Sequence, residues 1–181
     1  MDTLVRYNSP LGGITIASCG ETICGLWFEG QRHFGETLDL ERAVVEPQNF
    51  SSLPSVLHDT LRWLDTYFDG GIPDFTPHII LRGSEFRQMT WRLLQTIPYG
   101  QTMTYGEIAR RLMEEQGLPN KSARAVGGAV GHNPISLIVP CHRVVGADGT
   151  LTGYAAGLER KRWLLERERR SAYTLPIHCH S

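Results

Sequence analysis

The sequence predicts an α/β protein with two domains, a small sheet covered by a helix followed by a helical domain that contains a helix-turn-helix. Short runs of strand-forming residues between glycine turns indicate the sheet, and apolar residues at helical spacing indicate the helices. The net charge also changes sign between the two halves of the chain. A chain of 181 residues has room for one large domain or two small ones, with enough length to bury a core.

Three short strands are expected near the N-terminus, separated by two turns that contain glycine. The first turn is Gly12-Gly13, and the second, Cys19-Gly20-Glu21, fits a hairpin. A weaker strand is expected at residues 43–45. The three main strands are expected at residues 3–7, 13–18 and 22–28.

One helix should cover this sheet, because apolar side chains recur at helical spacing from Leu57 to Phe68 and Gly70-Gly71 then ends the pattern. The N-terminal domain is therefore expected to span residues 1–76, and it shows no pattern that points to a chemical reaction. Residues 77–170 form the second expected domain, and residues 171–181 form a tail.

The second domain contains several signals for helix starts. Ser84 precedes an apolar stripe at helical spacing and is the expected N-cap of a helix. Thr104 and Glu107 have the spacing of a capping box, and Ser122 is expected to cap a short helix that runs through residue 130. Two helices joined by a turn with glycine and proline, in a basic region, are typical of a helix-turn-helix.

The short helix after Ser122 carries almost only small side chains, and Arg124 is its one long side chain. Such a face can pack tightly against another helix. It can equally approach a nucleic-acid groove closely while Arg124 inserts into the duplex. The sequence pattern alone leaves both interpretations open. The small residues are Ala123, Ala125, Gly127, Gly128 and Ala129.

The two halves of the chain differ in net charge. Residues 1–81 contain four arginines and eleven acidic residues, a net charge of about −7. Residues 82–170 contain fourteen basic and eight acidic residues, a net charge of about +6. A basic half next to an acidic half favours a polyanionic partner for the basic half alone, although solvated charges can also segregate by chance.

Composition excludes several classes of protein. No apolar run approaches the roughly 18 residues of a membrane span, and the N-terminus does not resemble a signal peptide. The four cysteines form no disulfide framework, which agrees with a reducing compartment. We therefore expect a cytoplasmic protein with no membrane contact.

The residues from Leu137 to Val145 (LIVPCHRVV) carry the strongest chemical signal. An apolar run, expected to be a buried strand, stops at Pro140, which cannot donate to a strand ladder. Cys141 follows and is expected at the edge of the core, next to His142 and Arg143. A thiol is nucleophilic as thiolate, and nearby cationic groups lower its pKa. An ordinary half-buried cysteine is the alternative.

The wider segment resembles the O6-alkylguanine-DNA alkyltransferases, the single-use DNA repair proteins. The resemblance rests on ARAVGGAVGHNP at residues 123–134, PCHRVV at 140–145 and GTLTGY at 149–154. It continues into the last helix around Trp163 and upstream through residues 85–105, and covers most of the chain. The first two motifs together are highly specific.

The resemblance implies a ribonuclease H-like N-terminal domain and a winged-helix-like C-terminal domain. It implies transfer of an alkyl group from O6-alkylguanine in double-stranded DNA, after base flipping, irreversibly to Cys141. A relay from Cys141 through water to His142 and Glu168 would form the thiolate. From the sequence alone, Glu168 would be an ordinary solvated helix charge. No cofactor is implied, and the protein should be a monomer.

The remaining site residues also follow from the resemblance. Asn133 would hydrogen-bond within the turn beneath the nucleophile, and the Tyr105 hydroxyl would assist departure of the guanine. Otherwise Tyr105 is simply a large residue with a polar tip. The base pocket would be formed by Val144, Tyr154 and Ala155. DNA contacts would come from Arg124, Ser122, Ala123, Ala125 and Gly127.

No metal site is expected from the sequence. Cys19, Cys24 and His78 fall near positions where some relatives in this family hold zinc, but three candidate ligands fall short of the usual tetrahedral set. The His178-Cys179-His180 tail could chelate a metal, although a frayed terminus is the simpler interpretation.

Three other functions remain as alternatives. A binding protein without alkyl transfer would have another residue in place of Cys141. A helix-turn-helix regulator would need base-reading side chains on its second helix, which the small residues do not supply. A Cys-His thiol hydrolase would turn over many times on a substrate other than nucleic acid, and the basic half of the chain speaks against it.

Overall fold

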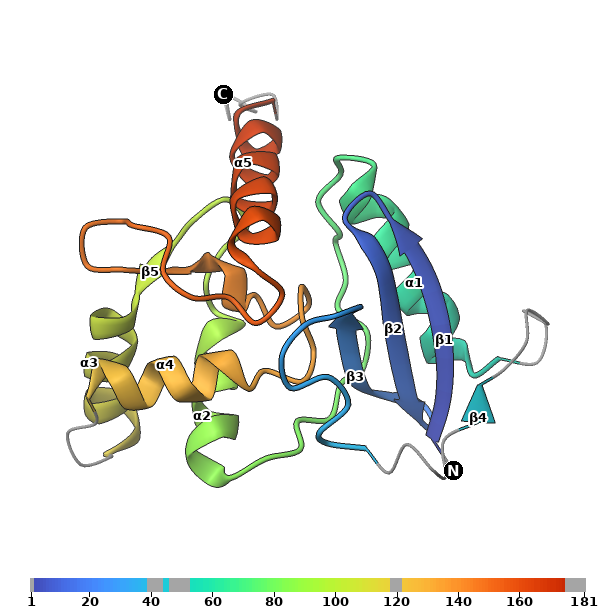
Figure 1. The fold of residues 1–181 in the computed structure, drawn as a ribbon, viewed down its shortest axis with the longest axis horizontal. Coiled ribbons are helices and arrows are strands. Elements are labelled where there is room, and N and C mark those ends of the chain that lie inside the picture. Colours follow the sequence, from blue (N-terminus) through green and yellow to red (C-terminus); the bar gives the residue numbers. More distant parts are fainter. Residues whose placement is uncertain (1, 39–43, 46–52, 118–121, 175–181) are drawn as a thin grey trace, which may run out of the picture.

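The computed structural model describes residues 2–38, 44–45, 53–117 and 122–174. Figure 1 shows a sheet with one long helix on one side of the molecule and a group of helices on the other. The last helix, α5 (Leu158–Thr174), stands between these two parts. It extends past residue 170, where the sequence pattern placed the end of the second domain.

The N-terminal part is a four-stranded sheet. Its strand order is β3-β2-β1-β4, with β1, β2 and β3 antiparallel and β4 parallel to β1. Gly12 and Gly20 take positive φ values of 101° and 58°, and they form the two turns that the sequence predicted. All four expected strands are present: β1 (Asp2–Ser9), β2 (Gly12–Cys19), β3 (Thr22–Phe28) and β4 (Val44–Val45).

Helix α1 (Ser55–Phe68) covers one face of this sheet, as its apolar spacing predicted. Its buried side chains include Leu57, Leu64 and Tyr67, which join the core formed by the inward-facing residues of the strands. Burial of these apolar side chains contributes on the order of 2 kcal/mol each. The same helix thereby brings the Tyr67 hydroxyl to the boundary between the two parts of the molecule.

The C-terminal part is built from short helices whose starts are capped as expected. Ser84 accepts from the backbone N–H of Arg87 ahead of α2 (Glu85–Leu94). Thr104 and Glu107 form the complete capping box of α3 (Tyr105–Gln116). Ser122 accepts from the N–H of Ala125 at the start of α4 (Ala123–Gly131). Helices α3 and α4 contact each other and are the two helices of the predicted helix-turn-helix, whereas residues 118–121 of the turn between them lie outside the described residues.

A small ribbon and a link to the sheet hold the segment that follows α4. Strand β5 (Met103–Thr104) pairs in parallel with β6 (Val144–Val145), which begins three residues after Cys141. On the sheet side, the N–H of Leu26 donates to the carbonyl of Pro134, and the N–H of Ser136 donates to the carbonyl of Leu26. The edge strand β3 therefore supports the turn that leads to the cysteine.

The buried strand expected at residues 137–139 is absent, and this prediction was wrong. These residues form a turn in which Leu137 has a φ of 70°, a left-handed conformation that no regular strand contains. The N–H of Val139 donates to the carbonyl of Ile135, which closes the turn. The apolar run reflects burial of this turn, since Leu137 and Val139 are almost inaccessible to solvent.

None of the helices in the described part of the chain is both long and apolar enough to cross a membrane.

Candidate active site

Cys141 begins a 3₁₀ helix, Cys141–Arg143, and its side chain is buried and only 4% exposed. The sequence placed it at the edge of the core, and the structure places it inside. Pro140 ends the preceding turn, and Val144 then continues into β6. The thiol is thus held by backbone on both sides, in a position that does not depend on a flexible loop.

Asn133 organises the turn beneath the thiol. Its Nδ2 donates to Cys141 Sγ at 3.0 Å and to the carbonyl of Val139 at 2.8 Å, while its Oδ1 accepts from the N–H of Ile135 at 3.0 Å. A buried amide with both ends engaged fixes the turn and supplies a donor to the sulfur. Asn133 therefore lies in the turn beneath the thiol, which is where the resemblance placed it.

The resting thiol is not a preformed thiolate. Burial raises the pKa of Cys141, while the hydrogen bond from Asn133 and the charge of Lys161 lower it, and the net shift is upward. The sequence pattern suggested that nearby cationic groups would lower this pKa, but desolvation outweighs them. A partner that takes the thiol proton is therefore needed for nucleophilic attack.

His142 follows Cys141 directly in the chain, and its side chain is fully buried. Burial lowers the pKa of His142, although Glu168 acts in the opposite direction, so that the imidazole is neutral at pH 7. Its Nε2 lies 2.7 Å from Glu168 Oε1, and its Nδ1 is buried with no hydrogen-bond partner among the described residues. Because the carboxylate accepts from Nε2–H, the lone pair resides on Nδ1 and can accept a proton.

Glu168 is fully buried and not a solvated helix charge. Arg143 binds it with two parallel hydrogen bonds, Nε to Oε2 at 2.9 Å and Nη2 to Oε1 at 3.0 Å. The Tyr67 hydroxyl and the N–H of Gly100 donate to it at 2.8 and 3.1 Å. Burial would raise the pKa of Glu168, but His142 and Arg143 outweigh burial and hold that pKa well below its usual range.

Two residues of this network were missed by sequence reasoning. Tyr67 lies in the other domain, more than seventy positions before Cys141, and no local pattern connects it to Glu168. Arg143 was noted only as a neighbour of the thiol, and its pairing with a residue on α5 has no sequence signal beyond the Cys-His-Arg motif itself.

Lys161 is a third residue that the sequence did not single out. It is fully buried, and its Nζ donates to the carbonyls of Thr152 and Gly153 at 3.0 and 3.1 Å. Burial lowers its pKa to about 8, which leaves most of the side chain charged at pH 7. Its charge favours the thiolate of Cys141 and its hydrogen bonds fix the loop before Tyr154. A lysine in a basic helix gives no sign of such burial.

The residues expected to form a base pocket surround the same region. Val144 and Tyr154 are buried, and burial together with the neighbouring Cys141 raises the pKa of Tyr154 well above its usual value. Tyr105 donates its hydroxyl to the carbonyl of Thr152 at 3.1 Å. The carbonyl of Ala155 accepts from the N–H of Arg32, so that the loop after β3 closes one side of this region.

Apart from Arg124, the exposed residues of α4 are small. Val126, Ala129 and Val130 pack into the core, and the indole N–H of Trp91 donates to the carbonyl of Ala129 at 2.8 Å. Ser122, Ala123 and Arg124 are exposed, whereas Ala125 and Gly127 are half-buried. A Cβ added at Gly128 would meet no protein atom within 4 Å. Packing against another helix therefore does not explain the glycine at this position.

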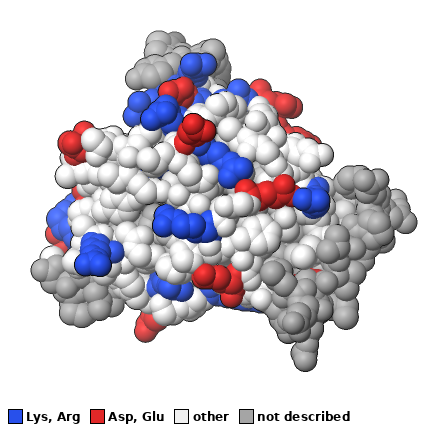
Figure 2. Space-filling model, in the orientation of Figure 1, with Lys and Arg blue, Asp and Glu red and all other residues white. Residues whose placement is uncertain are grey.

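On the face that Figure 2 shows, charge is less segregated than in the sequence. On the face shown in Figure 2, basic and acidic side chains are interspersed, and neither sign forms one continuous patch. The excess of arginine in the second half thus supplies scattered positive charges on this face.

The guanidinium of Arg82 lies near Cys19 and Cys24, the two cysteines of the sheet. Arg82 pairs with Asp2 at 3.4 Å and lies near Cys24 and Cys19, which help to raise its pKa against the opposing effect of burial. Cys24 Sγ is directed to the carbonyl of Ala17, and burial raises its pKa to about 11. His78 uses its backbone carbonyl to bind Ile23. These side chains do not form a ligand cluster among the described residues, and the tail at 178–180 lies outside them.

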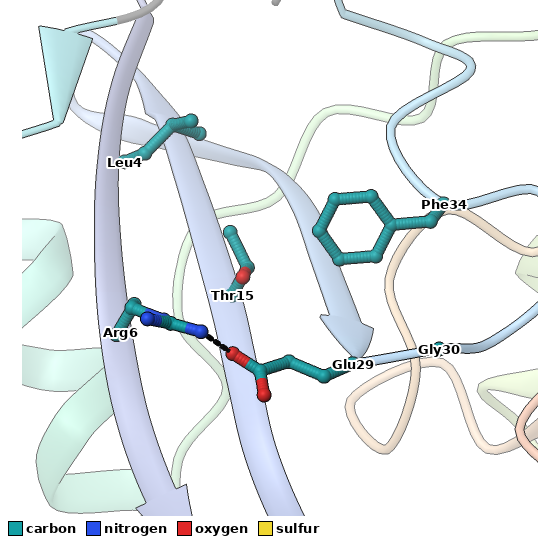
Figure 3. A pocket seen from close by; sticks show the side chains of 6 residues that line it. All are labelled: Leu4, Arg6, Thr15, Glu29, Gly30 and Phe34. Atoms are coloured by element: carbon teal, nitrogen blue, oxygen red, sulfur yellow. Dashed lines mark hydrogen bonds and ion pairs between the residues drawn. The ribbon is translucent and has the colours of Figure 1, made fainter.

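A separate pocket of about 600 Å³ lies on the outer face of the sheet. Figure 3 shows Arg6 and Glu29 forming an ion pair across it, with Phe34 on its opposite side. None of the residues expected to act in catalysis lines this pocket, which is formed by Leu4, Arg6, Thr15, Glu29, Gly30 and Phe34.

Comparison with known families gives a match to each part of the chain. Residues 85–170 match the model described as 6-O-methylguanine DNA methyltransferase, DNA binding domain. Residues 5–78 match the model described as 6-O-methylguanine DNA methyltransferase, ribonuclease-like domain. The fold class expected from the resemblance is confirmed by these matches.

Individual relatives agree over most of their length. A methylated-DNA–protein-cysteine methyltransferase from Mycobacterium bovis is 43% identical over 165 residues, which are 91% of each chain. A protein of the same name from Methanosarcina acetivorans is 40% identical and covers 90% of this chain and 95% of its own. The crystal structure of Mycobacterium tuberculosis OGT in complex with DNA superposes with a TM-score of 0.76 and 41% identity, covering 93% of this chain and 94% of that one. This chain belongs to the 6-O-methylguanine-DNA methyltransferase family.

Proposed function

We propose that this protein repairs double-stranded DNA by transferring the alkyl group of O6-alkylguanine to Cys141. The observation that carries the proposal is the buried chain of Asn133, Cys141, His142 and Glu168, in which Glu168 fixes the proton on His142 Nε2. His142 Nδ1 is thereby left able to take the thiol proton. Relatives in the same family are named as methyltransferases with a protein cysteine as acceptor.

The reaction is a displacement at carbon. The Cys141 sulfur forms a bond to the alkyl carbon as the bond from that carbon to guanine O6 breaks. The thiol proton passes through a bridging water to His142, which later releases it to solvent, and the departing guanine anion takes up one proton from solvent. In the structure the Tyr105 hydroxyl donates a hydrogen bond to the carbonyl of Thr152. During the reaction it would donate to the base instead and stabilise that anion. No cofactor takes part, because the protein itself accepts the alkyl group.

A base inside a duplex cannot reach a buried thiol, so the target nucleotide must rotate out of the stack. Helix α4 supports this step in two ways. Its small residues, of which Ala123 is exposed and Ala125 and Gly127 are half-buried, would allow the helix backbone to approach a groove closely. Arg124 is exposed on the same helix and would occupy the gap that the flipped base leaves. Ser122 positions the start of the helix as its N-cap.

The flipped guanine would enter the region bounded by Val144, Tyr154 and Ala155. The Tyr154 hydroxyl, which lies beside the Cys141 thiol, and backbone groups of its loop would be the polar contacts for the base edge. The protein would act as a monomer in the cytoplasm, where the thiol stays reduced.

Labelled duplex DNA tests the proposal directly. After incubation with duplex that contains O6-[³H-methyl]guanine, label should move to the protein and to the peptide that contains Cys141. Cys141→Ser should bind the same duplex and gain no label, whereas Cys24→Ser should gain label as the natural protein does. Label that remains on DNA, or label on another cysteine, would refute the assignment.

A further inference from the structure

We propose that His33, Glu36 and His132 form a binding site for a divalent transition-metal ion of the Zn²⁺ type. The site would join the loop after β3 to the end of helix α4. Each residue offers one ligand atom, and these three atoms lie within 4.8 Å of one another. It is the one group of its kind among the described residues, and it is separate from Cys141 and from the two cysteines of the sheet.

The geometry brings the two rings together with the carboxylate beside them. The imidazole rings of His33 and His132 stack with centroids 3.7 Å apart and planes inclined by 28°. Glu36 Oε1 lies 2.6 Å from His33 Nδ1. The three residues line an open cavity of about 310 Å³, so that an ion and its water molecules can reach them. An ion held by His33 and Glu36 would displace the proton that these two groups share.

His132 is oriented as metal-bound histidines usually are. Its Nδ1 lies 2.7 Å from the carbonyl of Gly128, the residue one helical turn earlier in α4. A ring that donates Nδ1–H to a backbone carbonyl keeps its lone pair on Nε2, directed away from the helix. His132 is also the C-cap of α4, so its backbone position is fixed by the helix itself.

His33 is held in an unusual backbone conformation that places its ring on His132. Its φ is 61°, in the left-handed region that non-glycine residues rarely occupy. The loop is anchored on both sides of it: Gln31 Oε1 accepts from the N–H of Phe28 at 2.9 Å, and Phe34 packs against Trp27 at 5.6 Å. These contacts on either side of His33 hold it in its strained backbone conformation.

The donor set determines the class of ion. Two imidazoles and one carboxylate are typical of Zn²⁺ sites that keep a fourth position for water, whereas Ca²⁺ and Mg²⁺ prefer oxygen ligands alone. Two arginines line the same cavity and oppose a cation. Arg82 is already paired with Asp2, which leaves Arg87 as the main opposing charge, and the carboxylate of Glu36 contacts the His33 ring directly.

A bound ion would connect the two domains next to the nucleophile. His132 directly precedes Asn133, whose amide donates to Cys141, and the loop that carries His33 also donates from Arg32 to Ala155. Occupancy should therefore stabilise the folded two-domain arrangement, because an ion that binds only the native state raises its stability by mass action.

The test uses the full-length protein after chelator treatment, without DNA, so that its result does not depend on the proposed repair function. Calorimetric titration with Zn²⁺ should show one site, and Zn²⁺ should raise the melting temperature. With Co²⁺, the absorption spectrum should show ligand-field bands without a thiolate charge-transfer band. His33→Asn, Glu36→Gln and His132→Asn should each weaken binding by about tenfold or more.

Matched controls separate this site from other ligands in the chain. His58→Asn, on the exposed side of α1, and the double variant His178→Asn/His180→Asn in the tail should bind Zn²⁺ as the natural protein does. Glu36→Gln is the decisive variant, because its exposed side chain can change without disturbing the core. Unchanged binding in Glu36→Gln, a thiolate band with Co²⁺, or loss of the ion in the tail variant would each overturn the proposal.

Discussion

The Tyr67 hydroxyl donates to Glu168 Oε1 at 2.8 Å, although the two residues lie 101 positions apart and belong to different domains. The same oxygen accepts from His142 Nε2 at 2.7 Å. One carboxylate oxygen therefore connects the helix that covers the N-terminal sheet to the histidine beside the nucleophile. In this arrangement the N-terminal domain contributes to the environment of the candidate base.

Tyr67→Phe should test that contribution. Removal of the hydroxyl takes one donor from a buried carboxylate, and we expect a loss of about 1–3 kcal/mol in the free energy of unfolding. Urea denaturation monitored by tryptophan fluorescence measures this loss. Tyr7→Phe is the matched control, because Tyr7 donates to Asp65 at 2.9 Å in an exposed pair and should cost less than about 1 kcal/mol. Equal losses in the two variants would mean that the buried hydrogen bond contributes no more to the free energy of unfolding than the exposed one.

Glu168→Gln should slow alkylation and move the pH midpoint of the rate upward. The glutamine keeps an acceptor for His142 Nε2–H but no longer stabilises the imidazolium that forms when the thiol proton is transferred. Since burial already raises the pKa of Cys141, ionisation should then require a still higher pH. Single-turnover rates from pH 6 to 9, with DNA affinity measured in parallel, give the answer. An unchanged midpoint would show that Glu168 has a structural role only.

The same variant should also be less stable, and the pH dependence of this effect has a definite sign. The native pKa of Glu168 lies below its unfolded value, so its stabilising contribution is complete above about pH 4.3 and declines as the pH falls through the native pKa. Melting temperatures of the variant and the natural protein should therefore converge in acid. The comparison also shows at which pH the variant remains folded enough for the rate measurements.

Arg124→Ala should separate DNA handling from chemistry. If Arg124 fills the gap left by the flipped base, its loss makes base extrusion costlier and should slow repair of duplex DNA by about tenfold or more. Reaction with free O6-benzylguanine requires no extrusion and should remain near the natural rate. Equal slowing on both substrates would place the effect of Arg124 in folding or in the shape of the pocket.

Gly128→Ala should stabilise the protein and weaken its binding to DNA. Alanine is favoured over glycine inside a helix by about 0.5–1 kcal/mol, and its Cβ would meet no protein atom here. The added methyl group would, however, stand between α4 and the groove. Gly106→Ala in α3 is the control, with a similar gain in stability and a smaller effect on affinity. Unchanged affinity in Gly128→Ala would mean that α4 does not approach the duplex at this position.

Much of the fold follows from local patterns in the sequence. The glycine turns at residues 12 and 20, the capping box at Thr104 and the N-caps at Ser84 and Ser122 each predict the element that is observed. The turn at residues 137–139 could not be predicted, because an apolar run reports burial and not the backbone conformation. Its geometry depends on Leu137 at positive φ and on side-chain bonds from Asn133.

Only the site residues that lie in short sequence motifs could be predicted. Cys141, His142 and Asn133 lie within ten residues, whereas Tyr67 and Lys161 reach the site through tertiary packing. A tyrosine in an amphipathic helix and a lysine in a basic helix look the same whether they face solvent or a buried carboxylate. The group of His33, Glu36 and His132, which we propose as a metal site, likewise forms only when the two domains come together.

The most direct test of the central claim is the stoichiometry of repair. Cys141 is the only thiol in the described residues that lies beside a buried base, and the thioether formed on it offers no route back to a free thiol. With methylated duplex in excess, intact-mass spectrometry should show a single added methyl group, and repair should stop at about one lesion per protein molecule. Continued repair beyond that limit, or a protein whose mass does not change, would contradict self-alkylation at Cys141.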